Sequence, residues 1–444
     1  MSPLTSSEAL PAARPAPTAP GTAPDFSPIQ PRKVGAGRLP VGARARRVLR
    51  RIVLADRSRE GLVRMADQFV VRPLLSVLRI FPLLRRVGPK AKRDLGLSIG
   101  RQVFDLLRLV LLHGAKPANY YLCECYRPGG MAAARAIVMR NEIKHGIGKA
   151  LNRLDPNALK RRRNLGDKLL AGAWCDEHGF PHAPPLMLVE DGQAKLLRPE
   201  AALDRDLFAK RREGRGAYKV TPYRRVAPLR YEDRNGRAVT LRDIVDELLA
   251  RKPRRAWMIV PQLHNHPELA DLSGQSLLTF RALTCLDERM RPVLTNLYLR
   301  SLTKLEPQWN VGRLEEYGAP IDLETGRLGQ CTGDKPECLS EYFDTHPVTG
   351  ARVAGREVPR WRELAQLAID LHRAVPERVF IGWDLALTPE GPMFLEGNSF
   401  ADLIFPERVF RQAVGDMRLG ELLDFHLGRI EAALDRGENP GAEA

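Results

Sequence analysis

The segment from Ile381 to Ser399 carries three oxygen-bearing side chains at a spacing that suits metal binding: Asp384, Glu396 and Asn398. It reads as a β-hairpin, with two apolar strands joined by a Thr-Pro-Glu-Gly turn. Because side chains alternate between faces along a strand, Glu396 and Asn398 share one face, and antiparallel pairing can bring Asp384 to the same end. Two carboxylates and an amide oxygen, with no Cys or His among them, suit Mg²⁺ or Mn²⁺ rather than zinc. Since Mg²⁺ usually takes further oxygens from substrate phosphates, the hairpin indicates a nucleotide site, whereas solvated strand ends and a Gly-Asn turn are the alternative interpretation.

A second group of residues suits phosphate binding. Lys210 lies near the end of an apolar strand expected over residues 207–211, and Gly214, Gly216 and Lys219 follow in a short loop. Glycines let backbone N–H groups approach phosphate oxygens closely, and a lysine adds a point charge. A plain hairpin turn is the alternative interpretation of this loop.

Two further positions have chemistry that needs a partner. Arg281 lies inside an otherwise apolar strand, where its charge requires either a phosphate or the carboxylate of a buried ion pair. Gln262 and Leu263 follow an apolar strand at a bend marked by Pro261. That position suits a hinge whose backbone contacts an adenine edge, and an ordinary strand end is the alternative.

The elements that must position these residues alternate between helix and strand from about residue 155. We expect helices over residues 168–180, 240–251, 361–374, 406–414 and 419–434. Besides the hairpin, we expect strands over residues 186–189, 207–211, 217–220, 256–263, 277–286 and 293–299. Helices mixed with adjacent hairpins favour an α+β fold over one parallel sheet.

The first part of the chain differs in composition. Residues 1–40 are rich in Pro, Ala, Ser and Gly, which predicts a disordered tail. Residues 41–154 show amphipathic helical periodicity, and from Arg44 to Arg93 basic residues outnumber acidic ones about five to one. Either the apolar faces of these helices pack on the rest of the protein, or the basic helices bind an anionic membrane surface.

Composition limits the class of protein further. The chain has 444 residues, a net charge of +17 and 44% hydrophobic residues, so it is long enough for several cores and its charge indicates a polyanionic partner. Six scattered cysteines without a Cys-x-x-Cys pair favour a reducing compartment. No apolar run is long enough to span a bilayer, and no secretory signal is apparent. We therefore expect a cytoplasmic protein, either free or peripheral at the inner membrane face, and no nucleic-acid partner because the basic block lacks interleaved aromatics.

Taken in order, these residues resemble the ATP-grasp superfamily, and the details are similar to its sugar-transfer-associated branch. The motifs that carry the resemblance are Asp167-Lys168, Phe208-Ala-Lys210, the Gly214/Gly216 loop, Leu278-Thr-Phe-Arg281-Ala-Leu-Thr284, Pro320-Ile-Asp322-x-x-Thr-Gly326, His346-Pro-x-Thr-Gly350, Ile381-Gly-Trp-Asp384 and Leu395-Glu396-Gly-Asn398. The resemblance covers roughly residues 155–405 and implies two α+β subdomains that grip ATP. It divides the chain into a tail (1–40), a basic helical extension (41–154), the ATP-grasp region (155–405) and C-terminal helices with a short tail (406–444).

The resemblance implies roles for the candidate residues. It assigns ATP binding to seven of them: Lys168, Lys210, Gly214, Gly216, Lys219, Gln262 and Leu263. The first two lysines would contact the phosphates, the glycine loop would close over them, and the last two residues would lie along the adenine. Arg281 and Lys210 would act in catalysis, with the arginine facing the transferred phosphoryl group, and Asp384, Glu396 and Asn398 would hold Mg²⁺ or Mn²⁺.

ATP-grasp enzymes typically phosphorylate a carboxylate to an acyl phosphate, which a nucleophile then attacks. The resemblance therefore implies an Mg²⁺- and ATP-dependent carboxylate ligase with an amine or hydroxyl nucleophile, acting in polysaccharide or cell-surface glycan biosynthesis on an unidentified carboxylate. Two alternatives stay open. One is an ATP-dependent kinase of a sugar or other hydroxyl, and the other is a non-catalytic basic adaptor with a vestigial nucleotide site.

Overall fold

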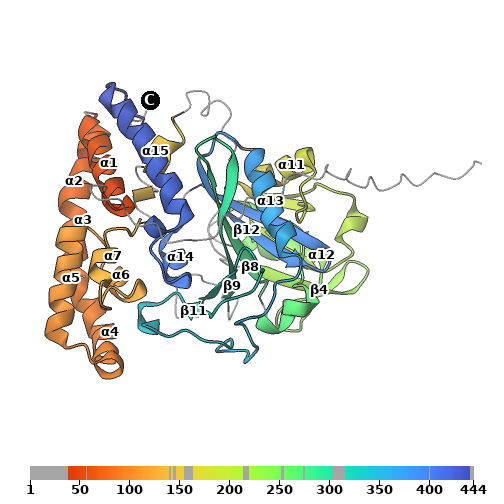
Figure 1. The fold of residues 1–444 in the computed structure, drawn as a ribbon. Helices are drawn as coiled ribbons and strands as arrows, with labels where there is room; N and C mark the ends of the chain where they lie inside the picture. The colour runs from red at the N-terminus through yellow and green to blue at the C-terminus, as the bar shows by residue number, and fades with distance from the viewer. Residues whose placement is uncertain are drawn as a thin grey trace, which may run out of the picture.

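The computed structural model describes the chain from residue 39 to residue 440, with internal gaps. The gaps are residues 57, 140–141, 144–146, 155–163, 214–219, 252–254, 274–275, 303–315 and 400. The tail predicted over residues 1–40 lies outside the described residues, except for its last two positions. In the described chain, a group of N-terminal helices stands on one side and two sheets stand on the other, with the C-terminal helix between them (Figure 1).

The N-terminal region is helical, as its periodicity predicts. Its helices are α1 (Val41–Ala55), α2 (Arg59–Ala66), the π-helical turn η1 (Asp67–Val71), α3 (Arg72–Leu78), α4 (Ile80–Leu95), α5 (Ile99–His113), α6 (Ala118–Leu122), α7 (Gly130–Ala133) and α9 (Gly148–Leu151). Ser58 and Ser98 cap α2 and α5 by accepting backbone N–H groups of the first turn. Gly96 and Gly114 end α4 and α5 in the left-handed conformation, which glycine adopts without strain.

The apolar face of α1 packs on α15 (Arg418–Asp435), the long C-terminal helix. Val48, Leu49 and Ile52 are buried in this interface. Arg44 adds two ion pairs across this interface, one to Asp424 Oδ1 at 2.7 Å and one to Glu431 Oε2 at 2.6 Å. This part of the basic region therefore packs on the protein itself.

The first sheet has seven antiparallel strands in the order β2-β1-β7-β3-β4-β5-β6. Their bounds are β1 Met187–Glu190, β2 Gln193–Leu196, β3 Leu207–Arg211, β4 Thr221–Ala227, β5 Arg230–Glu232, β6 Ala238–Thr240 and β7 Trp257–Pro261. Helix α11 (Lys168–His178) precedes the sheet, and α12 (Leu241–Ala250) begins at a capping box of Thr240 and Asp243. Short 3₁₀ turns η3 (Glu200–Leu203) and η4 (Pro267–Leu272) connect the strands.

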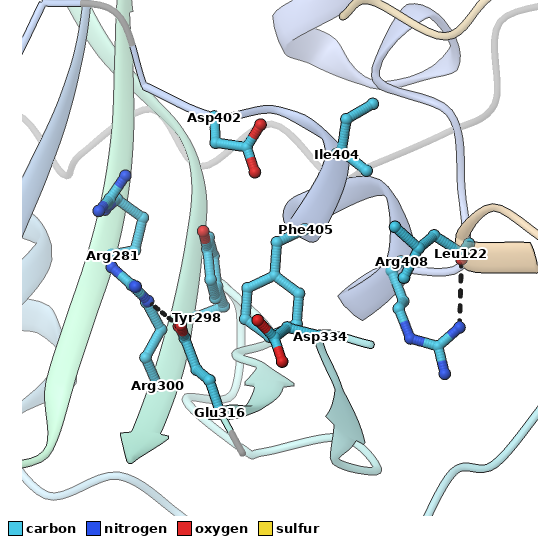
Figure 2. Close-up of a pocket in the computed structure, with 10 residues that line it drawn as sticks. All are labelled: Leu122, Arg281, Tyr298, Arg300, Glu316, Asp334, Asp402, Ile404, Phe405 and Arg408. Atoms are coloured by element: carbon cyan, nitrogen blue, oxygen red, sulfur yellow. Dashed lines mark hydrogen bonds and ion pairs between the residues drawn. The ribbon is translucent and has the colours of Figure 1, made fainter. Parts of the chain in front are cut away.

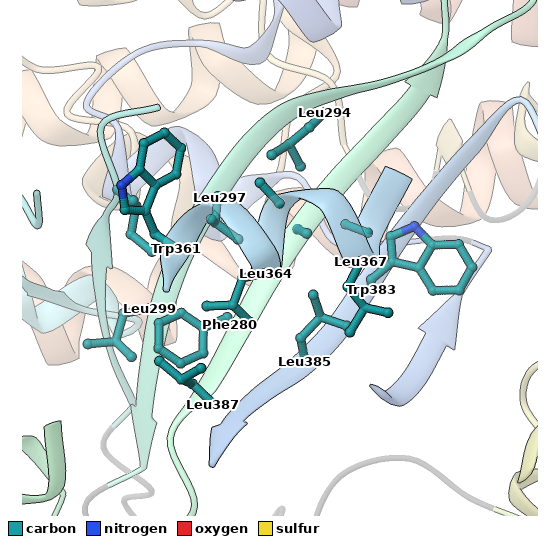
Figure 3. Close-up of a cluster of buried hydrophobic side chains, with 14 of the residues drawn as sticks. Phe280, Leu294, Leu297, Leu299, Trp361, Leu364, Leu367, Trp383, Leu385 and Leu387 are labelled. Atoms are coloured by element: carbon teal, nitrogen blue, oxygen red, sulfur yellow. The ribbon is translucent and has the colours of Figure 1, made fainter. Parts of the chain in front are cut away.

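The second sheet has six antiparallel strands in the order β11-β10-β9-β8-β12-β13. Their bounds are β8 Thr279–Leu286, β9 Pro292–Leu302, β10 Glu316–Pro320, β11 Thr332–Gly333, β12 Phe380–Thr388 and β13 Gly391–Asn398. Helix α13 (Trp361–Arg373) lies across one face, where Leu364 packs over Phe280, Leu297 and Leu385 (Figure 3). Because α13 covers this face, the side chains that alternate with the core residues point to the other face.

The C-terminal segment and some strands differ from the sequence-based expectation. The helix predicted over residues 406–414 is wrong in extent: α14 covers only Ile404–Val409, because Arg411 takes a left-handed φ of 53° that ends it, and the 3₁₀ turn η6 (Val414–Asp416) follows. Strands β2, β5, β6, β10 and β11 were not expected. They are short, and β2 is exposed throughout, so they lack the apolar alternation that marks a strand. The strand expected over residues 217–220 falls mostly outside the described residues, and β4 begins at Thr221.

Candidate nucleotide and metal site

The three predicted metal ligands meet at one end of the β12–β13 hairpin. Asp384 pairs directly opposite Glu396, and Gly382 pairs opposite Asn398. The register shifts next to this pair, because β13 carries one extra residue there, and such bulges re-aim side chains. The Asn398 side-chain amide Nδ2 donates to Asp384 Oδ2 at 3.3 Å. The predicted gathering of the three side chains is therefore present in the structure.

Arg281 lies opposite Asp384 on the neighbouring strand β8, on the same face of the sheet. Its Nε donates to Asp384 Oδ1 at 2.6 Å and its Nη2 donates to Oδ2 at 3.0 Å. Arg300 on β9 adds a weaker contact from Nη1 to Asp384 Oδ1 at 3.4 Å and pairs more closely with Glu316 (Figure 2). Of the two partners that the sequence left open for Arg281, the structure shows the carboxylate.

The two carboxylates of the hairpin have opposite electrostatic surroundings. Burial acts to raise the pKa of Asp384, but the adjacent guanidinium groups of Arg281 and Arg300 outweigh it and hold that pKa below its ordinary value. Burial raises the pKa of Glu396, although the charge of Lys168 opposes it. No residue of the described chain donates a hydrogen bond to the Glu396 carboxylate. Glu396 is therefore the carboxylate of this site without a hydrogen-bonded partner in the described chain, and nearby cations act on it only through their charge.

Lysines from the other half of the fold face this hairpin. Lys210 is the fourth residue of β3, and Lys168 opens α11 directly after its N-cap residue Asp167. Burial and the charge of Lys168 lower the pKa of Lys210 to about 8, although the charge of Glu396 opposes them. Lys210 of the first sheet and Lys168 of helix α11 therefore lie close enough to Glu396 of the second sheet to interact with it electrostatically. The structure thus brings together six of the predicted residues: Lys168, Lys210, Arg281, Asp384, Glu396 and Asn398.

The start of α11 is fixed by a second ion pair. The side chain of Asp167 accepts the N–H groups of Leu169 and Leu170, which caps the helix. Arg212, just after β3, donates to Asp167 from Nε at 3.0 Å. This pair ties the helix that carries Lys168 to the strand that carries Lys210.

The structure describes the residues predicted to lie along the adenine but not those of the predicted glycine loop. Gln262 and Leu263 follow β7, the strand that pairs with β3 through Met258 and Lys210, and the Gln262 N–H donates to the Asp206 carbonyl at 2.9 Å. They therefore lie at the end of β7 that pairs with the start of β3, whereas Lys210 pairs with Met258 near the other end, and their role toward adenine stays a prediction. The other three predicted ATP-binding residues, Gly214, Gly216 and Lys219, lie outside the described residues.

The donor set fits a hard cation, with one complication. None of the described residues donates a hydrogen bond to Glu396, and Asn398 uses its Nδ2, which leaves its Oδ1 oxygen for a ligand. Both Asp384 oxygens already accept from Arg281, so this carboxylate would have to share its lone pairs with a metal. Within the described ranges no group of three or more His, Cys, Asp or Glu could hold a metal. Any Mg²⁺ here would depend on Glu396, Asn398 and further oxygens from a phosphate or water.

Sequence reasoning missed the residues that surround Arg281. A pocket of about 150 Å³ adjoins it, lined in part by Tyr298 and Arg300 of β9 and by Asp402 and Phe405 near α14 (Figure 2). One signal existed for Arg300, which also lies within an apolar strand. The others approach Arg281 only through tertiary packing, which leaves no local pattern.

Similarity to solved structures is remote. The VanG D-Ala:D-Ser ligase from Enterococcus faecalis is 13% identical with a TM-score of 0.35, and the match covers 60% of this chain and 61% of that one. The D-alanine–D-alanine ligase from Bacillus anthracis, complexed with ATP, is 9% identical with a TM-score of 0.33, covering 60% and 66%. The biotin carboxylase domain of 2-oxoglutarate carboxylase from Hydrogenobacter thermophilus, in complex with MgADP and bicarbonate, is 12% identical with a TM-score of 0.33, covering 55% and 41%. This chain spans less than two thirds of each of them, and scores this low carry no argument about function.

The family assignment rests on the sequence. No curated protein matches the chain. The profile of the sugar-transfer associated ATP-grasp family matches residues 154–414, which contain both sheets, the hairpin and the two lysines. This range is more than half of the chain and includes all of the region, residues 155–405, that the motifs predicted. The chain belongs to the sugar-transfer associated ATP-grasp family, and its fold is the ATP-grasp fold.

Proposed function

We propose that the protein is an ATP-dependent ligase that transfers the γ-phosphoryl group of ATP to a carboxylate and forms an acyl phosphate for attack by a nucleophile. One observation carries this proposal: Lys168 and Lys210 face Glu396 across the two sheets, beside the Arg281–Asp384 pair. Phosphoryl transfer requires mainly positioning and charge neutralisation from the protein. The arrangement offers both, and family membership supports ATP as the nucleotide.

Each residue has a defined task in this mechanism. Lys168 and Lys210 bind phosphate oxygens, and the burial that lowers the Lys210 pKa is offset once an anion lies beside it. Asp384 fixes the Arg281 guanidinium through two hydrogen bonds, while Nη1 of Arg281 forms none with the described residues. That preorganised group can stabilise charge on the transferred phosphoryl without reorganising. Glu396 and Asn398 would hold Mg²⁺, which when bound neutralises phosphate charge.

Hydroxylamine trapping tests the chemistry. The protein is incubated with ATP, Mg²⁺, hydroxylamine and a panel of sugar acids and amino acids, and both ADP and hydroxamate are measured. An acyl phosphate gives a hydroxamate in step with ADP. Release of ADP with a phosphorylated sugar and no hydroxamate would instead establish the kinase alternative, in which a hydroxyl takes the phosphate. Absence of ATP binding in the folded protein would favour the adaptor.

The family also supports a proposal about the biological setting. Its description as sugar-transfer associated supports a role in assembling or decorating a polysaccharide or cell-surface glycan. The unidentified carboxylate co-substrate would then be a sugar acid or a small acid joined to a sugar. Such a role requires an acceptor that reaches Arg281 and the adjoining pocket.

A membrane-facing surface is the second part of the proposal. Helices α2 to α5 lie on the outer side of the N-terminal region, away from the sheets (Figure 1). They expose large apolar side chains, including Phe81 at 72%, Phe104 at 66% and Leu112 at 73%. On α5, Phe104, Arg108 and Leu111 share one exposed face at helical spacing. Apolar and cationic groups thus alternate on a single surface.

An anionic bilayer matches both features of this surface. Apolar side chains can enter the headgroup region, and each arginine near an anionic surface contributes about 1 kcal/mol of attraction. Exposed Arg79, Arg85 and Arg108 lie among the apolar residues. No helix of the described ranges is long and apolar enough to cross a bilayer. We therefore infer peripheral association of this face with the inner membrane surface, at a cytoplasmic location.

A further inference from the structure

One side of the pocket beside Arg281 is formed by a residue outside the ATP-grasp region. Arg281 and Tyr298 line it from the second sheet, Phe405 lines it from α14, and Leu122 lines it from α6 in the N-terminal helices. Leu122 lies outside residues 154–414, which match the family. The N-terminal helices therefore complete a pocket that begins at the candidate transfer site.

Arg408 is a buried cation in this pocket that has no carboxylate partner among the described residues and lies 5.5 Å from the centre of the Tyr342 ring. Its side chain is 1% exposed, and it donates to the carbonyls of Gly333 at 2.6 Å, Leu339 at 2.8 Å and Leu122 at 3.2 Å. Its Nη2 has no hydrogen-bond partner, and no carboxylate of the described chain forms an ion pair with it. A buried charge is unfavourable unless it is paired. The guanidinium is therefore suited to an anionic group that enters the pocket.

Two carboxylates in the same pocket have acceptor atoms without a hydrogen bond among the described residues, although Asp334 pairs with Lys335 through Oδ2 at 3.4 Å. The Oδ1 atom of Asp334 is buried without a hydrogen bond, and burial, with the neighbouring Glu316, raises the Asp334 pKa to about 6. Asp402 forms no hydrogen bond or ion pair with any residue that the structure describes. Asp402 thus differs from Glu316, which Arg300 neutralises, and Asp334 keeps Oδ1 unused beside its pair with Lys335. They are suited to a group that donates hydrogen bonds or carries positive charge.

The charged groups occupy different positions along the pocket. Figure 2 shows Arg281 and Arg408 on opposite sides of the view, with Asp402, Asp334 and the Phe405 ring between them. A cavity of about 150 Å³ in another protein holds a ligand the size of benzene, so this pocket suits a molecule of amino-acid size.

We propose that this pocket binds a small zwitterionic co-substrate of the amino-acid class, with its anionic group on Arg408, its ammonium group on Asp402 and Asp334, and its hydrocarbon part against Phe405. This proposal rests on the proposed ligase function, in which the amine must approach an acyl phosphate formed beside Arg281. It selects an amine, rather than a hydroxyl, as the nucleophile: after the ammonium group gives a proton to one of the two carboxylates, its nitrogen forms the C–N bond while the acyl C–O bond to phosphate breaks and inorganic phosphate leaves. The acyl phosphate would form beyond Arg281, next to Asp384.

The test measures binding of alanine, serine and β-alanine to the full chain by calorimetry, with propanoate and ethylamine as probes that carry only one charge. At least one zwitterion should bind at least tenfold more tightly than both single-charge probes. Asp402→Asn should weaken that binding tenfold or more and leave ATP binding unchanged. Asp402 suits this substitution because it has no hydrogen bond or ion pair to lose among the described residues. Arg408→Lys is the second variant, with folding checked by circular dichroism, since Arg408 also supports three backbone carbonyls.

The outcomes separate this proposal from the ligase function. Propanoate or ethylamine binding as tightly as the zwitterions, or an Asp402→Asn variant with unchanged affinity, would overturn the pocket assignment. ATP binding without any zwitterion binding would overturn it and leave the ligase function standing. Zwitterion binding in a protein that binds no ATP would support the pocket while removing the ligase function.

Discussion

Arg281 and Asp384 face each other across strands β8 and β12 and form a two-hydrogen-bond ion pair, at 2.6 and 3.0 Å. The pair joins the residue expected to stabilise the transferred phosphoryl group to a residue expected to bind metal. It keeps Asp384 ionised and the guanidinium oriented. It also means that Asp384 has a structural task, so the two carboxylates of the hairpin are not equivalent.

The first prediction concerns this difference between Asp384 and Glu396. Asp384→Asn should lower the free energy of unfolding by about 3–5 kcal/mol, because it leaves the buried Arg281 charge without its carboxylate. Glu396→Gln should change the free energy of unfolding by less than about 1 kcal/mol, since Glu396 has no hydrogen-bonded partner in the described chain to lose. Urea unfolding of both variants measures the difference. Equal stability of the two variants would show that the ion pair does not support the fold.

The second prediction concerns pH. Because Lys210 binds phosphate only when protonated, and its pKa is lowered to about 8, ATP affinity should fall as pH rises through 8, by up to about tenfold per pH unit above the titration. The stability of the ligand-free protein should change in the opposite direction. The unfolded chain holds this proton up to its ordinary pKa of 10.5, so unfolding becomes less favourable between pH 8 and 10.5.

Lys210→Met provides the control for this pH dependence. The variant should bind ATP more weakly at pH 7 and should lose the decline above pH 8. Calorimetric titrations at several pH values measure both effects. A decline that persists unchanged in the variant would assign the titration to another group.

The third prediction concerns the close packing that positions the hairpin. A Cβ atom at Gly382 would lie 2.5 Å from the Ala401 Cβ atom, so Gly382→Ala should cost about 1–3 kcal/mol of stability and impair ATP binding. Gly100→Ala is the matched control, because Gly100 is in helix α5 with open space around the added atom. It should raise the stability by about 0.5–1 kcal/mol. Thermal unfolding compares the two, and destabilisation of similar size in both would contradict the account.

Much of this site follows from the sequence, and the reason is local spacing. Asp384, Glu396 and Asn398 belong to one hairpin, so alternation and pairing suffice to place them together. The partner of Arg281 needed the register between β8 and β12, which the sequence does not specify. The Arg408 side chain is held at the pocket by hydrogen bonds to backbone carbonyls of segments that are distant in the sequence. Such contacts depend on how the N-terminal helices dock on the sheets, and no periodic pattern encodes them.

The fourth prediction concerns the membrane-facing helices. The protein should sediment with vesicles that contain phosphatidylglycerol, less so as salt rises, and not with pure phosphatidylcholine vesicles. A Phe104→Ser and Leu112→Ser double variant should reduce the bound fraction at least about tenfold, because both exposed side chains lose apolar area. Met290→Ser with Val348→Ser is the control, since these exposed side chains lie outside the helices. Equal binding by both double variants would mean that this face does not contact lipid.

The central claim is that the two sheets form an ATP site in which Glu396 serves a bound metal. Calorimetry of ATP binding, with and without Mg²⁺, to the wild-type protein and to Glu396→Gln tests it most directly. We expect Mg²⁺ to tighten ATP binding to the wild type, and the substitution to remove most of that gain while the protein stays folded. ATP binding that ignores Mg²⁺, or a Glu396→Gln variant with the full metal dependence of the wild type, would contradict the account.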